Sequence, residues 1–291
     1  MPYEIFTDSS CNLPNDKINE YDVRVLPLTL IIEGEAISSA EKNNEEGYKG
    51  IYRLLREKKN ISTSCINTAT FVEAFEKSVK EGNDILYIGF SSALSETFNC
   101  GKTALEELKR KYPERKLVAI DSLCASLGEG LYVSYAAKLR LAGKSLEEVE
   151  SWLENNKMRL CHYFTVDDLY WLFKGGRVSK ASFIIANMAK IKPLMRTSEE
   201  GKLVPVRNVI GRKKALFEVA DSIVERIKDQ NPEEQEVFIG HGDCIEDAKL
   251  VADRISSKVK VKSFLFHYID PVIGAHSGPG TIAAFCLGDH R

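Results

Sequence analysis

The sequence predicts an α/β fold of two domains, and three observations support this prediction. Short apolar runs alternate with single helical segments through the first half, which is typical of a mostly parallel sheet with helices on both faces. Hydroxyl side chains follow the ends of several of these runs, where parallel sheets bind ligands. The pattern changes near residue 160. We therefore expect an N-terminal domain at 1–160 and a C-terminal α/β domain with a mixed sheet at 161–291.

Hydrophobic periodicity defines the elements of the first domain. Apolar runs predict strands, and apolar residues spaced three or four apart, such as Tyr48, Ile51 and Leu55, predict helices. The expected strands lie at 3–7, 23–32, 84–90 and 117–120. The expected helices lie at 16–21, 45–57, 69–80, 95–111, 123–141 and 146–158. Helix 123–141 is rich in small residues.

The second domain is expected to contain more strands relative to helices. Its predicted strands lie at 161–166, 203–206, 237–240, 259–267 and 281–287. Its predicted helices lie at 167–173, from Ala181 onward, at 212–228 and at 245–255. The pair Gly175-Gly176 closes the first of these helices as a C-cap would. Repeats and low-complexity tracts do not occur in the sequence.

Composition and charge argue against a nucleic-acid-binding, membrane-spanning or secreted protein. The 291 residues include 40 basic and 42 acidic side chains, and a net charge of −2 argues against nucleic acid as the main partner. The longest apolar runs are too short to span a bilayer, and no secretory segment opens the chain. Seven scattered cysteines without a CxxC pair indicate free thiols in a reducing compartment. We therefore expect a cytoplasmic protein.

One hydroxyl-rich segment points to an anion site. The run Ser91-Ser-Ala-Leu-Ser-Glu-Thr97 joins a buried strand to a helix, where backbone N–H groups and the helix dipole favour a bound anion. The hydroxyls of Ser92, Ser95 and Thr97 are candidate ligands for a carboxylate. Capping of the helix by Ser95 alone is the alternative.

Two glycine-containing segments of the second half supply further candidates. His276 stands in Gly274-Ala-His-Ser-Gly-Pro-Gly280, for which we expect an irregular loop whose backbone approaches a ligand closely. A histidine titrates near neutrality and can donate to a carboxylate in either protonation state. A purely structural role for His276 is equally open. Arg177, just beyond Gly175-Gly176, could clamp a carboxylate or phosphate.

A serine hydrolase is the alternative to a binding protein. Gly89-Phe-Ser-Ser-Ala93 approaches a nucleophile elbow, with Ser91 as nucleophile, His276 as base and Asp270 as acid. The second glycine of the elbow is missing, and acid and base only six positions apart are unusually close. The sequence has no metal-ligand spacing and no dinucleotide or Walker-type phosphate loop, so we expect no metal and no cofactor.

Taken in order, these motifs resemble those of the DegV family, bacterial fatty-acid-binding proteins that include the acyl-carrying subunit of fatty acid kinase. The matching segments are Thr7-Asp-Ser-Ser10, Ser62-Thr-Ser64, Ser91–Asn99, Asp121-Ser122, Val166–Val178, Lys192-Pro193 and His276–Gly280. The match spans the whole chain. Two positions depart from the family pattern: Ile66 replaces a proline and Glu96 replaces a glycine. We expect these two to affect chain preference and partner docking.

The resemblance implies a long apolar tunnel between the two domains that holds a fatty acid. Carried over by motif position, Thr63 and Ser95 would hydrogen-bond the carboxylate, His276 would lie close to it, and Arg177 would shape the head-group region. The family resemblance also implies that the protein is a carrier without catalysis of its own. It would present the carboxylate to a separate ATP-dependent kinase subunit, which forms an acyl phosphate for phospholipid synthesis.

Overall fold

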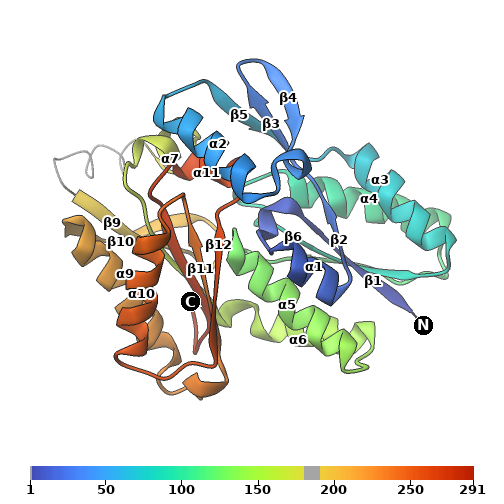
Figure 1. The fold of residues 1–291 in the computed structure, drawn as a ribbon. Coiled ribbons are helices and arrows are strands. Elements are labelled where there is room, and N and C mark those ends of the chain that lie inside the picture. The colour runs from blue at the N-terminus through green and yellow to red at the C-terminus, as the bar shows by residue number, and fades with distance from the viewer. Residues whose placement is uncertain (1, 180–190) are drawn as a thin grey trace.

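A computed structural model describes residues 2–179 and 191–291, and its strands form three sheets (Figure 1). Sheet A is parallel, with the order β2-β1-β6-β7. Its strands are β1 (Tyr3–Asp8), β2 (Val23–Leu26), β6 (Asp84–Gly89) and β7 (Leu117–Asp121). Its helices are α1 (Asn15–Tyr21), α3 (Thr68–Lys80), α4 (Thr97–Lys111), α5 (Leu127–Leu141) and α6 (Leu146–Asn156). The parallel sheet predicted for the first half is confirmed.

Alternating side chains of sheet A bury themselves on opposite faces. Ile5 and Leu86 belong to the core that contains α5 and α6, whereas Phe6 and Tyr87 belong to the core that contains α3 and α4. This period of two is what a strand covered on both sides requires. The predicted helices on both faces of the sheet are therefore present.

A small antiparallel sheet was not predicted. Sheet B has the order β4-β3-β5 and consists of β3 (Thr29–Ile32), β4 (Glu35–Ser38) and β5 (Ile61–Ser64). The prediction of one strand over 23–32 was wrong, because the chain leaves sheet A at Leu26 and enters sheet B at Thr29. Pro27 lies at the break, where it has no N–H to give to a ladder. Helix α2 (Glu45–Arg56) connects β4 to β5.

The second half forms sheet C, with the order β10-β9-β8-β13-β11-β12. Only β11 and β12 pair in parallel within it, so the predicted mixed sheet is confirmed. Its strands are β8 (Leu160–Thr165), β9 (Ile191–Thr197), β10 (Leu203–Ile210), β11 (Glu236–His241), β12 (Ser263–Tyr268) and β13 (Ile282–Leu287). Its helices are α7 (Tyr170–Lys174), α9 (Arg212–Ile227), α10 (Ile245–Ser256) and α11 (Pro271–Ser277). Short 3-10 turns cover Ser9–Cys11, Ser39–Lys42, Lys157–Arg159 and Pro232–Glu234.

Several expectations for the second half need correction. Strand β9 and helix α11 were missed, β10 runs four residues further than predicted, and β12 begins at Ser263 instead of residue 259. The helix predicted from Ala181 falls at residues outside those described.

Helix α5 joins the two halves. It packs against β1 and β6 of sheet A and against β8, β11 and β13 of sheet C, and its side chains are buried almost all round. A helix that is apolar on every side is expected only inside a core. The strands of sheets A and B precede residue 122, and those of sheet C follow residue 159. The exact domain boundary near residue 160 stays a prediction.

Candidate functional site

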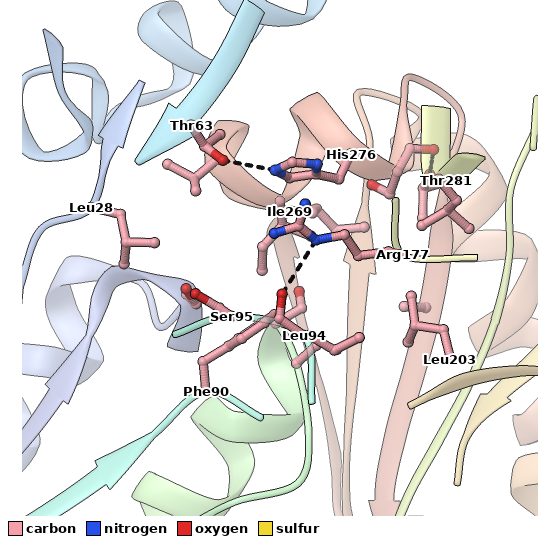
Figure 2. A pocket seen from close by; sticks show the side chains of 18 of the residues that line it. Leu28, Thr63, Phe90, Leu94, Ser95, Arg177, Leu203, Ile269, His276 and Thr281 are labelled. Carbon is pink, nitrogen blue, oxygen red and sulfur yellow. Dashed lines mark hydrogen bonds between the residues drawn. The ribbon is translucent and has the colours of Figure 1, made fainter. Parts of the chain in front are cut away.

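An apolar cavity of about 300 Å³ lies between the two halves of the protein (Figure 2). This volume is within the range of sites that hold small molecules. Its wall includes Leu28, Phe90, Leu94, Phe164, Leu172, Leu203, Ile269, Val272, Ile273 and Ala283. Sheets B and C, helix α11 and the segments that follow strands of sheet A, such as Phe90 after β6, all contribute, so the cavity exists only because the two halves meet.

Two predicted ligands meet at this cavity although they lie 213 residues apart. The Thr63 hydroxyl is 2.7 Å from Nε2 of His276, and Figure 2 shows both side chains at its edge. Thr63 comes from β5, a strand of sheet B that packs against α11. The sequence named these residues from different motifs, and the structure brings them together.

His276 is helical, which corrects the expected irregular loop. It lies in the last turn of α11, which begins where the carboxylate of Asp270 accepts from the N–H of Val272 at 2.7 Å and Pro271 takes the first position. Asp followed by Pro is a recognised helix start. The irregular backbone begins only at Gly278, where φ is +81°.

The environment of His276 keeps it neutral near pH 7. Burial, followed by the charge of Arg177, lowers the pKa of the imidazole to about 4. The expectation that it titrates near neutrality was therefore wrong. Its Nδ1 is buried and has no hydrogen-bond partner among the described residues. That atom lies directly against Gly175, where a side chain would overlap the ring.

Arg177 brings a positive charge to the cavity. Its Nε donates to the carbonyl of Leu94 at 3.3 Å (Figure 2), and its guanidinium also donates to the carbonyl of Gly175. No carboxylate forms an ion pair with it anywhere in residues 2–179 and 191–291. Burial lowers the pKa of this guanidinium, but an arginine stays charged in proteins. A half-buried cation without a carboxylate partner is able to attract an external anion.

The three hydroxyls of the strand–helix turn have different environments. Ser95 borders the cavity, and its Oγ lies 3.0 Å from Oγ1 of Thr97 and accepts from the Thr97 N–H at 3.3 Å. Thr97 is fully buried behind it. Neither Thr97 nor Ser92 is among the residues that line the cavity, and the N–H of Ser92 donates to Asp121. Helix α4 begins at Thr97, two residues later than predicted.

The residues of the alternative hydrolase do not form a triad. Ser91 is fully buried and its hydroxyl donates to the carbonyl of Gly201 at 2.9 Å. His276 hydrogen-bonds Thr63 instead of Ser91. Asp270 caps α11, and burial raises its pKa from 3.8 to about 7. No proton path therefore connects the proposed nucleophile, base and acid.

Ser277 was not selected from the sequence as a ligand. It borders the cavity beside His276, and its buried hydroxyl has no hydrogen-bond partner among the described residues. Its place within the motif His276-Ser-Gly-Pro-Gly280 was the only available signal, and serine alone in a glycine-rich run is not specific. An unpaired buried hydroxyl at the cavity that Thr63 and Arg177 also border could act as a further donor for an anion.

Two kinds of feature, a metal-binding cluster and a membrane-spanning helix, are absent from residues 2–179 and 191–291. This part of the chain has no cluster of three or more His, Cys, Asp or Glu side chains that could hold a metal ion. It also has no helix with the length and apolar character needed to cross a bilayer.

Comparison with solved structures identifies proteins with the same fold. A DegV family protein of Thermus thermophilus, whose structure describes fatty acid binding, is 26% identical, with a TM-score of 0.85 over 99% of this chain and 100% of the other. A hypothetical protein of Thermotoga maritima, whose structure revealed a fatty acid binding function, is 25% identical, with a TM-score of 0.83 over 99% of both chains.

Sequence comparison gives the same grouping. A DegV domain-containing protein of Clostridium perfringens is 44% identical over 290 residues, covering 99% of this chain and 98% of the relative. The model of a family described as "Uncharacterised protein, DegV family" matches residues 2–289. The chain therefore belongs to the DegV family.

Proposed function

We propose that this protein binds a long-chain fatty acid, with the acyl chain in the cavity and the carboxylate at the group formed by Thr63, Ser95, Arg177 and His276. The observation that carries the proposal is Arg177, a half-buried cation without a carboxylate partner in the described chain, placed at an apolar cavity beside a Thr–His pair. A ligand with one negative end and a long apolar body satisfies both features. The two solved relatives described above, which bind fatty acids, support the same ligand class.

Thr63 and His276 have different roles in binding the carboxylate. A proton on Nδ1 of His276 would leave a buried N–H without a partner against Gly175, so we assign the proton to Nε2. Nε2 then donates to the oxygen of Thr63, and the threonine hydroxyl is free to donate to a carboxylate. Arg177 supplies the charge, and Ser95 supplies a further hydroxyl.

The apolar cavity provides most of the binding free energy. Burying a chain of 16 carbons removes roughly 14 methylenes from water, on the order of 11 kcal/mol gross at about 0.8 kcal/mol each. Lost translational and conformational freedom offsets part of this gain. Tight retention of a lipid through purification is still expected.

The family resemblance extends the proposal to a partner. The protein would act in the bacterial cytoplasm as a carrier and present the bound carboxylate to a separate ATP-dependent fatty acid kinase. A carboxylate oxygen would attack the γ-phosphorus of ATP on the kinase, giving acyl phosphate and ADP for phospholipid synthesis. The protein itself would supply no catalytic group.

Native mass spectrometry of the purified protein tests the proposed ligand. We expect one fatty acid per chain, of about 14 to 18 carbons as the family resemblance implies, and its identity follows from solvent extraction. Delipidated protein should take up added fatty acid to the same stoichiometry. Protein that carries no lipid and takes up none after delipidation would overturn the proposal.

A further inference from the structure

His162 is a polar side chain in an aromatic part of the same cavity. It lies on β8, borders the cavity and is only 5% exposed. Its ring centre is 4.5 Å from that of Phe285 and 5.1 Å from that of Phe164. Neither the family motifs nor the carboxylate site uses this residue.

The imidazole of His162 has one ring nitrogen satisfied. Nδ1 is 3.8 Å from Sγ of Cys124. Burial, followed by the charge of Arg291, lowers the pKa of His162 to about 3, and burial raises the pKa of the Cys124 thiol to about 11. Both groups are therefore neutral near pH 7. Nε2 forms no hydrogen bond with a described residue, and the side chain borders the cavity.

Strand register places His162 far from the carboxylate site. On β13, Ala283 pairs with Phe164 and Phe285 pairs with His162. Four residues therefore separate the level of His162 from Thr281, which borders the cavity next to α11. At roughly 3.3 Å per residue this is about 13 Å along the strand. An acyl chain that starts at His276 would reach His162 with its distal half.

A second polar group that borders the cavity already has a partner. The hydroxyl of Ser126 donates to Oδ1 of Asn12 at 2.6 Å. His162 is thus the side chain here with an unsatisfied hydrogen-bonding nitrogen. A saturated chain packed on that nitrogen would leave it without water or a partner, which is unfavourable.

We propose that His162 is a specificity-determining residue that favours an acyl chain carrying a hydroxyl group in its distal half. A hydroxyl both donates and accepts, so it satisfies Nε2 whichever tautomer the Cys124 contact selects. This inference rests on the proposed fatty-acid function and adds a substrate class to it. The best-placed hydroxyl should bind about ten-fold more tightly than the plain chain, the effect of one buried hydrogen bond gained in place of an unsatisfied group.

Competition binding on delipidated full-length protein tests this inference. The probes are stearic acid and its monohydroxy derivatives, with the hydroxyl moved along the distal half of the chain. For the native protein we expect one derivative to exceed stearic acid about ten-fold. His162→Phe keeps the aromatic packing with Phe164 and Phe285, and we expect it to reverse that order. The residues proposed to bind the fatty acid carboxylate are unchanged in this variant, so it should bind stearic acid at least as tightly as the native protein does.

The outcomes separate the two proposals. Native protein that binds stearic acid but prefers none of the hydroxylated chains would overturn the role of His162 and leave the fatty-acid function intact. An unchanged preference in His162→Phe would overturn it as well. Native protein that binds none of the probes would overturn the fatty-acid function itself. If His162→Phe does not fold, the nitrogen chemical shift of His162 Nε2 decides the matter: it should differ between the stearic and hydroxystearic complexes, and equal shifts would contradict the inference.

Discussion

Single hydroxyls at the carboxylate site differ in what they can contact. Ser95 and Thr63 border the cavity, whereas Ser91 is buried with its hydroxyl on the carbonyl of Gly201. We expect Thr63→Val and Ser95→Ala each to weaken fatty acid retention by about ten- to a hundred-fold, as the loss of a hydrogen bond to a charged group costs roughly 1.5–3 kcal/mol. Ser91→Ala should retain fatty acid within a few-fold of the native protein.

Exchange of a fluorescent fatty acid measures this ranking, after circular dichroism confirms that each variant is folded. The hydrolase alternative ranks the same variants in the opposite order, because it makes Ser91 the nucleophile. Loss of function in Ser91→Ala together with normal binding by Ser95→Ala would reject the carboxylate site proposed here.

Asp270 is expected to make the free energy of unfolding depend on pH. Burial raises its pKa from 3.8 to about 7, so between these values the folded protein keeps a proton that the unfolded chain has lost. Stability contributed by this group is therefore present at low pH and is lost as the pH rises toward 7. The change amounts to roughly 4 kcal/mol at about 1.4 kcal/mol per unit.

Asp270→Asn removes this titration and keeps an acceptor for the N–H of Val272. Relative to the native protein, the variant should gain free energy of unfolding as the pH rises from 5 to 8, measured by urea denaturation of the delipidated proteins. Asp253→Asn, at an exposed position of α10, is the matched control and should show no such trend. A difference for Asp270→Asn that is independent of pH would contradict the assignment.

At the scale of the elements, the packing of α7 on α11 sets the position of His276. Gly175 ends α7 and lies against Nδ1 of His276, so a Cβ there would overlap the ring. We expect Gly175→Ala to displace His276 from Thr63 and to lower fatty acid affinity at least ten-fold, measured by the same exchange assay. Gly50→Ala on α2, where a Cβ meets open space, should leave affinity unchanged and stabilise its helix by up to about 1 kcal/mol. Equal affinities for the two variants would contradict this role of Gly175.

The elements recovered from the sequence are those whose pattern is local. Phe6 and Tyr87 lie on one face of their strands and Ile5 and Leu86 on the other, and such alternation can be read without tertiary information. Sheet B could not be read in this way. Its strands have only four residues each. In the sequence, β3 follows β2 of sheet A within a single apolar run, so the change of sheet is not visible. Their pairing depends on contacts between distant segments.

The sequence motifs also identified part of the cavity wall. Thr63, Ser95, Arg177 and His276 all border the cavity, as expected from the motifs. Ser92 and Thr97 do not, because two hydroxyls in one turn point to different sides of the chain, and spacing alone does not show which of them faces a cavity. No sequence motif indicated that His162 borders the cavity. A histidine within a strand becomes informative only when the register places it at a cavity wall.

On the scale of the whole molecule, both halves supply walls of the cavity, and the four residues proposed to bind the carboxylate come from four separate segments. The sequence contains no phosphate-binding loop. We therefore expect no ATP hydrolysis by this chain alone, and acyl phosphate only when a fatty acid kinase is added, measured as ADP release and hydroxamate formation. ATP turnover by the isolated protein would contradict the carrier role.

The measurement that tests the central claim most directly compares stearic acid with stearyl alcohol, which has the same chain but no charge. Titration into the delipidated protein should show one site per chain for the acid and at least ten-fold weaker binding of the alcohol. Arg177→Met, which keeps the apolar stem and removes the cation, should reduce that preference. Equal affinity for the acid and the alcohol, or a preference that Arg177→Met leaves intact, would contradict a carboxylate held at Arg177, Thr63 and His276.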